Sequence, residues 1–336
     1  MSLSVSLLEM PDVVMAIILR NADLRSILIL RKVCRGLREF IDINKPETHL
    51  DFVRISVNTE SIKLDMPFDS VKYQKNEGGC WISGRKSRRK LLKNLDFMPV
   101  FLNDFKIIMK NQKSAVGNYQ VHFHLFKDHD FRNEELLETK FLEMWRQSVQ
   151  QWGHLIPVKE LIMSTVSEQE VMSVLPYIDS EILESIDMFD ARYVESFPID
   201  IDRIIQLKQW KNLKTLKMNH LIVSCPLEQF SHFSTVSIFR TSLTGEELTE
   251  LKEVFTKSTT LTSMELTYSS INKTEICDQL GQPCETHYEM SRNIKTWEAR
   301  LPYSTLQISL ARKEKNYVFR LQKFPQSEAV KCPPDK

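Results

Sequence analysis

The stretch MPDVVMAIILRNADLRSILILRKVCRGLREF, residues 10–40, carries the strongest structural signal in the chain. Polar residues divide it into three predicted helices, but residues 13–19 are an unbroken apolar run and residues 24–30 are nearly as apolar. A surface helix of a globular protein shows one apolar stripe, so helices that are apolar on most sides must be covered from two directions. A segment this short cannot bury that much surface alone. The sequence therefore predicts that the rest of the chain, or another protein, covers these helices.

A pattern of specific residues runs through this stretch without a gap. It consists of Leu8, Met10-Pro11, Val14, Ile18-Leu19, Asp23-Leu24, Leu28, Leu30, Val33-Cys34-Arg35, Leu37 and Arg38. The pattern resembles the F-box family, whose three-helix module docks on a Skp-family adaptor in cullin-RING ubiquitin ligases. The resemblance implies that the residues that dock on the adaptor, or pack the helices that do, are Met10, Pro11, Val14, Ile18, Leu24, Leu28, Val33, Cys34 and Leu37.

The stretch departs from the family pattern at four positions. Met10 replaces the usual leucine, and Ala22 replaces a large aliphatic residue. Val13 and Ile17 stand where charged residues are common in the family, which leaves open the side of the helix that faces the partner. The alternative to docking is that the three helices form an internal cap on the domain that follows.

The composition restricts the broad class of the protein. With 336 residues, 42% hydrophobic and 26% charged, the chain has the make-up of a globular protein. The formal net charge of +1 argues against a general role at nucleic acids or membranes. No apolar run approaches the roughly 18 residues of a transmembrane helix. The N-terminal segment is a poor match to a signal peptide, because no basic residue precedes Arg20. We expect a cytoplasmic or nuclear protein, or one found in both places.

A six-residue frame recurs in the second half of the chain. VKELIM, LESIDM, LKTLKM, FSTVSI and LTSMEL begin at residues 158, 183, 213, 233 and 261, each with apolar residues at positions one, four and six. Residues 50–55 and 303–308 fit the same frame. Capping boxes that start with Ser167 and Thr244 predict helices between frames. The spacing is irregular but near that of leucine-rich repeats, so the sequence predicts an irregular leucine-rich-repeat-like β-α solenoid with a parallel sheet.

A second resemblance lies in the same region. LPYIDSEILESIDM, QLKQWKNLKTLKM and SIFRTSLTGEELTELKEVF, at residues 175–188, 206–218 and 237–255, resemble the FTH-type domain that follows the F-box in a large nematode family. The chain is therefore predicted to be an α+β or α/β protein with three parts: an F-box at residues 7–44, a target-binding domain at 49–325 that is best matched at 158–268, and a disordered tail at 326–336. No catalytic residues follow from this resemblance.

Two further elements are predicted between the F-box and the repeated frames. Residues 71–82 read as a hairpin that turns at Gly78-Gly79. Residues 133–150 read as a helix, since Leu137, Phe141, Trp145 and Val149 recur every four residues.

Motifs for catalysis or for cofactors are weak. GCWISGRKS at residues 79–87 lacks the lysine that a phosphate loop needs directly after its second glycine. His122, His124 and His129 lie close together but offer no convincing third ligand for zinc. We find no metalloprotease, hydrolase or dinucleotide signature, and we predict a non-catalytic chain without metal or cofactor. The basic stretch at residues 85–93 could contact RNA, an acidic partner or an import receptor.

The repeated frame also predicts a surface for the target protein. Residues beside the fourth position of each frame point to the opposite side of the sheet from the apolar positions. They are Glu160 and Ile162, Ser185 and Asp187, Thr215 and Lys217, Thr235 and Ser237, and Ser263 and Glu265. These residues are mixed in charge, so they do not indicate a particular ligand.

Together these patterns favour a substrate-recognition subunit of an SCF-type cullin-RING ubiquitin ligase. Its predicted partners are a Skp-family adaptor, through it a cullin, and an unknown target protein, with nucleic acid an unlikely partner and no membrane. The alternative is a non-catalytic protein-binding or RNA–protein scaffold that acts outside ubiquitination.

Overall fold

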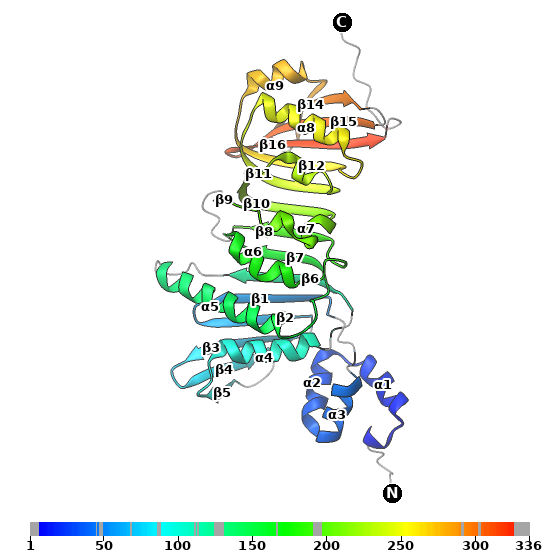
Figure 1. The fold of residues 1–336 in the computed structure, drawn as a ribbon, viewed down its shortest axis with the longest axis vertical. Coiled ribbons are helices and arrows are strands. Elements are labelled where there is room, and N and C mark those ends of the chain that lie inside the picture. The colour runs from blue at the N-terminus through cyan, green and yellow to red at the C-terminus, as the bar shows by residue number, and fades with distance from the viewer. Residues whose placement is uncertain are drawn as a thin grey trace. The chain divides into compact units, whose positions relative to one another are not determined.

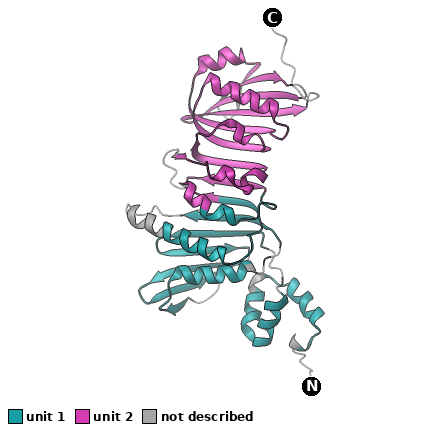
Figure 2. Ribbon diagram, in the orientation of Figure 1, with its two compact units in different colours: residues 1–162, 173–183 teal, residues 163–172, 184–336 magenta. Residues whose placement is uncertain are grey.

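The computed structural model describes residues 7–325, with gaps at residues 45, 47–49, 68, 86–88, 111, 113, 124–130, 166, 191–196, 290–291 and 302–303. The chain divides into two compact units, residues 1–162 with 173–183 and residues 163–172 with 184–336 (Figure 2). Residues 326–336, for which a disordered tail is predicted, lie outside the described part.

The first unit begins with the three helices that the sequence predicts (Figure 1). A short 3-10 turn, η1 (Leu7–Glu9), precedes α1 (Asp12–Arg20), α2 (Leu24–Val33) and α3 (Arg35–Asn44). The Pro11 carbonyl accepts the Val14 and Met15 amides of α1, and the Asp23 carboxylate accepts the Ser26 N–H at 2.7 Å to cap α2. Leu19, Ile27 and Ile41 form a small buried core with Ala22, Leu30 and Phe40 around it.

A mixed sheet forms the rest of the first unit, with strands in the order β7-β6-β1-β2-β3-β4-β5. Its strands are β1 (Phe52–Asn58), β2 (Ser61–Met66), β3 (Asp69–Asn76), β4 (Gly79–Gly84), β5 (Lys90–Lys93), β6 (Val116–Phe123) and β7 (Val158–Ser164). Strand β1 pairs parallel with β6, and β1 to β5 pair antiparallel. The predicted hairpin is confirmed, and its Gly79 has φ +142° with the Leu92 carbonyl where a Cβ would stand.

Two helices cover one face of this sheet, α4 (Phe97–Lys110) and α5 (Phe131–Gln150) (Figure 1). Val53, Ile55 and Val57 point to the covered face and are fully buried, because alternate residues of a strand face opposite sides. An aromatic cluster joins helices to strands, with Phe105 packed on both Tyr119 and Trp145. The predicted helix is confirmed, although it starts two residues earlier than Asn133.

The second unit contains the other strands and most of the helices of the repeated frames. Its strands are β8 (Ser185–Phe189), β9 (Phe197–Ile199), β10 (Thr215–Val223), β11 (Thr235–Leu243), β12 (Ser263–Ile271), β13 (Glu285–Glu289), β14 (Arg292–Arg300), β15 (Ser304–Lys313) and β16 (Asn316–Pro325). Helices and 3-10 turns alternate with them: α6 (Glu168–Val174), η2 (Leu175–Tyr177), η3 (Ile204–Gln206), α7 (Lys208–Asn212), η4 (Leu227–Phe230), α8 (Gly245–Lys257) and α9 (Lys273–Leu280). Residues 173–183, with the end of α6 and all of η2, belong to the first unit.

The repeated frames form strands as predicted. Strands β8, β10, β11 and β12 are parallel neighbours, and their fourth frame positions, Ile186, Leu216, Val236 and Met264, are aligned across the sheet. These four side chains are at most 1% exposed. The apolar positions of the frame therefore build the core, and the residues between them stay on the opposite face.

The predicted helix starts agree with the structure, but the last predicted frame does not. Both N-cap hydrogen bonds form: the Ser167 hydroxyl accepts the Glu170 N–H at 3.4 Å and the Thr244 hydroxyl accepts the Glu247 N–H at 3.2 Å. The frame at residues 303–308, in contrast, does not continue the parallel series. Strand β15 pairs antiparallel with β14 and β16, and β16 pairs antiparallel with β12, so the end of the chain is a meander.

The result is a mixed α/β protein with N-terminal helices and mixed sheets. Among the described residues, no helix combines the length and the apolar character that crossing a membrane requires.

Candidate functional site

The first candidate surface is an apolar patch on α1. Val13, Val14, Ile17 and Ile18, named here the α1 patch, are 71%, 40%, 52% and 38% exposed. Residues four apart are neighbours on a helix, so the 13/17 and 14/18 pairs form two adjacent rows. Met15 and Leu19 on the other side of the helix are buried. Helix α1 thus packs inward on one side and presents aliphatic side chains to solvent on the other.

The remaining residues of the predicted docking set differ in exposure. Val33 is 65% exposed and lies one helical turn after Ile29, which is 54% exposed. Pro11 is exposed, whereas Met10, Leu28 and Cys34 are half-buried and Leu37 is buried. The side chain of Leu24 lies outside the described residues. Exposed members can contact a partner directly, and Leu37 can only support the helices that do.

Cys34 has a local role at the junction between α2 and α3. Its backbone is extended and ends α2, and its Sγ accepts the Leu37 N–H at 3.5 Å. A side-chain acceptor at this position satisfies one of the free amides at the start of a helix.

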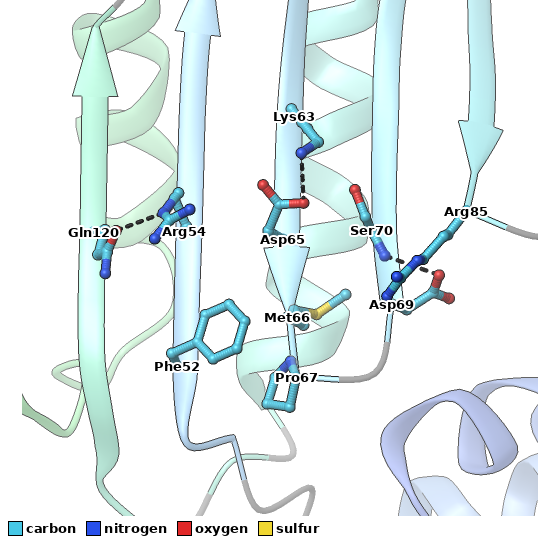
Figure 3. A pocket seen from close by; sticks show the side chains of 10 residues that line it. All are labelled: Phe52, Arg54, Lys63, Asp65, Met66, Pro67, Asp69, Ser70, Arg85 and Gln120. Carbon is cyan, nitrogen blue, oxygen red and sulfur yellow. Dashed lines mark hydrogen bonds and ion pairs between the residues drawn. The ribbon is translucent and has the colours of Figure 1, made fainter.

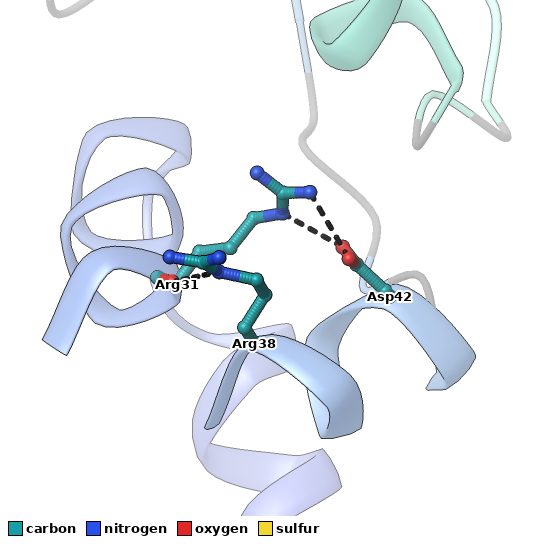
Figure 4. A network of polar contacts seen from close by, with 3 residues as sticks. All are labelled: Arg31, Arg38 and Asp42. Atoms are coloured by element: carbon teal, nitrogen blue, oxygen red, sulfur yellow. Dashed lines mark hydrogen bonds and ion pairs between the residues drawn. The ribbon is translucent and has the colours of Figure 1, made fainter. Parts of the chain in front are cut away.

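An ion pair fixes α2 against α3 (Figure 4). Arg31 Nε and Nη2 donate to the two carboxylate oxygens of Asp42 at 2.7 and 3.0 Å, and Arg38 Nε donates to the Arg31 carbonyl at 3.2 Å. The hydrogen bond to Asp42 raises the pKa of Arg31. Bidentate pairs of this kind add geometric definition. They hold the helix that carries Val33 in one orientation.

The second candidate surface is the uncovered side of the sheet in the first unit. Polar side chains alternate there with the buried ones, and Arg54, Gln120, Asn118 and Glu160 form a hydrogen-bonded chain across β1, β6 and β7. Its donor–acceptor distances are 2.5, 2.6 and 2.5 Å. Glu160, a predicted target-binding residue, is therefore engaged with Asn118.

This uncovered side contains a hollow of about 680 Å³ (Figure 3). It is lined by residues of β1, β2, β3 and β6 and by the turn after β4: Phe52, Arg54, Lys63, Asp65, Met66, Pro67, Asp69, Ser70, Arg85 and Gln120. In Figure 3 the helices lie behind the strands, and Arg54, Lys63 and Asp65 stand on the viewer's side. Lys63 Nζ lies 2.9 Å from Asp65 Oδ1.

The predicted target-binding residues of the second unit share one face of its sheet. Ser185, Thr215, Thr235 and Ser263 are aligned across four parallel strands, and Asp187, Lys217, Ser237 and Glu265 form the next row. Each of these eight is half-buried or exposed. We call the eight residues the polar rows. Glu265 pairs with Arg320 of β16 at 2.6 Å, and Asp187 accepts from Asn219 at 3.2 Å.

The candidate metal and phosphate motifs of the sequence can be compared with the described part of the chain. Within the described residues no three His, Cys, Asp or Glu side chains come together to hold a metal ion. His122 contacts Gln120 at 3.1 Å, and His124 and His129 lie outside the described residues. Residues 79–84 are strand β4, so the glycine-containing segment does not form a phosphate loop there.

The buried ionic contact of the second unit has a structural explanation. Arg240 Nε on β11 contacts Glu247 Oε1 of α8 at 2.5 Å, and Arg240 also donates to the Cys225 carbonyl at 2.8 Å. Burial raises the pKa of Glu247, and the charge of Arg240 opposes that rise. The contact joins a helix to the sheet beneath it.

The hollow was missed by the sequence analysis, except for Arg85, which belongs to the basic stretch. A signal was present, because Arg54 alternates with Val53 and Ile55, and Lys63 and Asp65 alternate with Ile62 and Leu64. Alternation predicts which residues face away from the core. It does not show that four strands bring them to one place, because that depends on pairing between distant segments.

The comparisons with known proteins fit this arrangement. An F-box domain model matches residues 7–49, and an FTH domain model matches residues 139–282. The chain is 24% identical over 259 residues to F-box A protein 224 of Caenorhabditis elegans, a match that covers 76% of this chain and 64% of the relative. The chain thus spans slightly less than two thirds of that relative. The chain therefore carries an F-box domain followed by an FTH domain, and it is similar to an F-box A protein of Caenorhabditis elegans.

Proposed function

We propose that the chain is a substrate-recognition subunit of an SCF-type cullin-RING ubiquitin ligase. The observation that carries the proposal is the α1 patch, four aliphatic side chains exposed on a helix of the matched F-box domain. F-box domains generally bind Skp-family adaptors, and F-box proteins are generally not catalytic themselves. A contiguous apolar surface of this kind marks a protein interface.

The proposal assigns a role to each part of the chain. Met10, Pro11, Val14, Ile18 and Val33 contact the adaptor, Leu28 and Cys34 lie at the margin of the contact, and Leu37 supports the helices. The strand–helix units of β8, β10, β11 and β12 act as a leucine-rich-repeat-like solenoid whose polar rows face the target protein. The chain brings the target's lysines near a conjugating enzyme held elsewhere in the complex, so its contribution to the reaction is proximity.

Co-expression with a Skp-family adaptor, followed by size-exclusion chromatography, tests this function. We expect wild type to elute as a stable complex and Ile18→Asp to elute alone, because a buried charge without a partner is strongly unfavourable at an interface. Ile43→Asp, at a 78% exposed position on α3 outside the docking set, is the matched control and should keep the complex. Hydrogen exchange over residues 12–44 must match wild type in the variant. A folded wild-type chain that remains free of adaptor would exclude the docking role.

A second function is favoured by one observation, the exposed basic groups around β4 and β5. Arg89 stacks over the Trp81 ring at 4.5 Å and donates to Gln74 at 3.2 Å, and Arg85 is exposed. Such a surface would suit an RNA–protein scaffold outside ubiquitination. A salt-sensitive RNA affinity that Arg89→Gln abolishes, in a chain without adaptor binding, would favour it.

A further inference from the structure

The hollow of the first unit lies in a part of the chain that neither domain match covers. Its lining residues fall between positions 52 and 120, whereas the matches end at residue 49 and resume at residue 139. The proposed function so far assigns it no role.

The charge on this hollow is not balanced by the protein itself. Lys63 is paired with Asp65, and Asp69 accepts the Ser70 N–H at 2.9 Å. Arg54 contacts only the neutral amide of Gln120, and among the described residues neither Arg54 nor Arg85 forms an ion pair. The lining thus holds three cationic side chains, Arg54, Lys63 and Arg85, against the two carboxylates of Asp65 and Asp69, which leaves an excess of one positive charge.

A neighbouring lysine adds to this excess. Lys72 of β3 lies directly opposite Lys63 of β2 in the antiparallel register, and both are exposed. Like charges directly opposite each other destabilise a strand pair. An anion bound at this place would offset that cost.

The lower end of the hollow has a different character. Phe52, Met66 and Pro67 are apolar and lie at the ends of β1 and β2, beside the charged groups (Figure 3). A ligand that fits the whole hollow therefore carries negative charge next to an apolar group. The guanidinium fork suits the planar carboxylate.

We propose that this hollow binds an extended acidic segment of another protein, with carboxylates at Arg54 and Arg85 and an apolar side chain at Phe52 and Pro67. The idea that this other protein is a ubiquitination target rests on the proposed function. The binding of an acidic segment in the hollow rests on the lining residues alone. RNA could also supply negative charge, but the apolar end gives it no phosphate contact, so the observations favour a peptide.

Fluorescence anisotropy tests the proposal on the full chain. The probe is a fluorescein-labelled peptide of glutamate and serine with one leucine, and the control peptide has lysine in place of glutamate. We expect saturable binding of the acidic probe only. Arg54→Gln combined with Arg85→Gln should weaken it about tenfold, because charge-assisted hydrogen bonds are the stronger kind.

The matched control removes two charges from the covered side of the same sheet. Lys106 on α4 and Arg146 on α5 are exposed, and changing both to Gln removes the same net charge as the hollow variant. We expect the affinity of this variant to stay within about twofold of wild type. Equal weakening by both variants would mean general electrostatic attraction and would overturn the proposal, as would the absence of saturable binding.

Two further readouts separate this inference from its alternatives. Single-stranded oligouridylate that binds in the hollow while the acidic peptide does not would assign the hollow to RNA and reject the proposal. Adaptor binding is measured on the same preparations, where the hollow variant should keep it. Peptide binding without adaptor binding would reject the ligase function and support the inference. Adaptor binding without peptide binding would support the ligase function and reject the inference.

Discussion

The α1 patch and the uncovered sheet faces are both exposed to solvent, but they differ in chemistry. On the sheets, alternation sends apolar side chains to the helix-covered face and leaves Arg54, Lys63, Thr215 and Lys217 outside. On α1, in contrast, the side chains that face the solvent are aliphatic, like those that face the core. A polar sheet face is stable in water without a partner, so exposure there does not by itself indicate binding. An aliphatic patch gains free energy when another surface covers it, so its exposure supports the proposed docking role.

The difference can be given a magnitude. The exposed fractions in the α1 patch together equal roughly two fully exposed aliphatic side chains. Covering them would contribute on the order of 3–6 kcal/mol before the costs of association. The polar rows offer no comparable apolar gain, so a target there has to be held by charge and hydrogen bonds.

The largest effect is expected from a neighbouring pair on β10. Leu216 is fully buried, whereas Lys217 is exposed and belongs to the polar rows. Leu216→Ala should lower the free energy of unfolding by about 2–5 kcal/mol, because it removes buried apolar contact and leaves a cavity. Lys217→Ala should change it by less than about 0.5 kcal/mol. Urea denaturation followed by tryptophan fluorescence measures both. Similar losses for the two would mean that the register assigned to β10 is wrong.

A matched pair on α2 makes the same comparison inside the F-box. Ile27 is fully buried in the small core, and Ile29 is 54% exposed. Ile27→Ala should destabilise the three helices by about 2–4 kcal/mol, near the low end for core truncations because few side chains surround the site. Ile29→Ala should cost less than about 0.5 kcal/mol. Hydrogen exchange of residues 12–44 reports this region separately. Fast exchange in both variants would argue that Ile29 is also packed.

Features that depend on local spacing were predictable from the sequence. The F-box helices and the repeated frames follow from spacing within short segments, and Leu216 or Val236 could be assigned to the core from six residues. The sequence also marked Val13 and Ile17 as a departure from the family pattern, but it left open which side of the helix faces a partner, and their exposure came from the structure. Local periodicity determines such features because each segment sorts its own side chains.

The hollow and the C-terminal meander were not predictable in this way. Arg54, Lys63 and Gln120 meet only because β1 pairs with β6, more than sixty positions away in sequence. The frame at residues 303–308 has the right apolar spacing, yet β15 runs antiparallel. Spacing within a strand carries no information on the direction of its neighbours, so a pattern argument cannot distinguish the two cases.

A smaller effect distinguishes the two rows of the α1 patch. Val14 and Ile18 are less exposed than Val13 and Ile17 and so lie nearer the helix bundle. Residues near the centre of an interface carry most of its energy. Combining Val13→Asp with Ile17→Asp should therefore weaken adaptor binding by about tenfold, less than Ile18→Asp alone. Titration by biolayer interferometry measures the difference. A greater loss from the 13/17 variant would place that row at the centre of the interface.

The smallest effect concerns the covered side of the sheet that carries the hollow. Tyr73 of β3 donates its hydroxyl to Asp104 of α4 at 2.9 Å. Burial raises the pKa of Asp104 above its ordinary value near 3.8, and the Tyr73 hydroxyl opposes the rise. A carboxyl group whose pKa is higher in the folded state stabilises the fold fully below the ordinary value, and this contribution is lost as the pH rises through the folded pKa.

Asp104→Asn should remove that pH dependence, because an amide oxygen still accepts from Tyr73 but does not titrate. The free energy of unfolding of the variant, relative to wild type, should rise with pH through the acidic range and then level off. Urea denaturation at successive pH values measures it. Tyr73→Phe removes the opposing hydrogen bond, so it should shift the same change to higher pH. A difference between Asp104→Asn and wild type that stays constant with pH would mean that burial does not raise the pKa of this carboxyl group, and that the sheet tolerates charge equally on both of its faces.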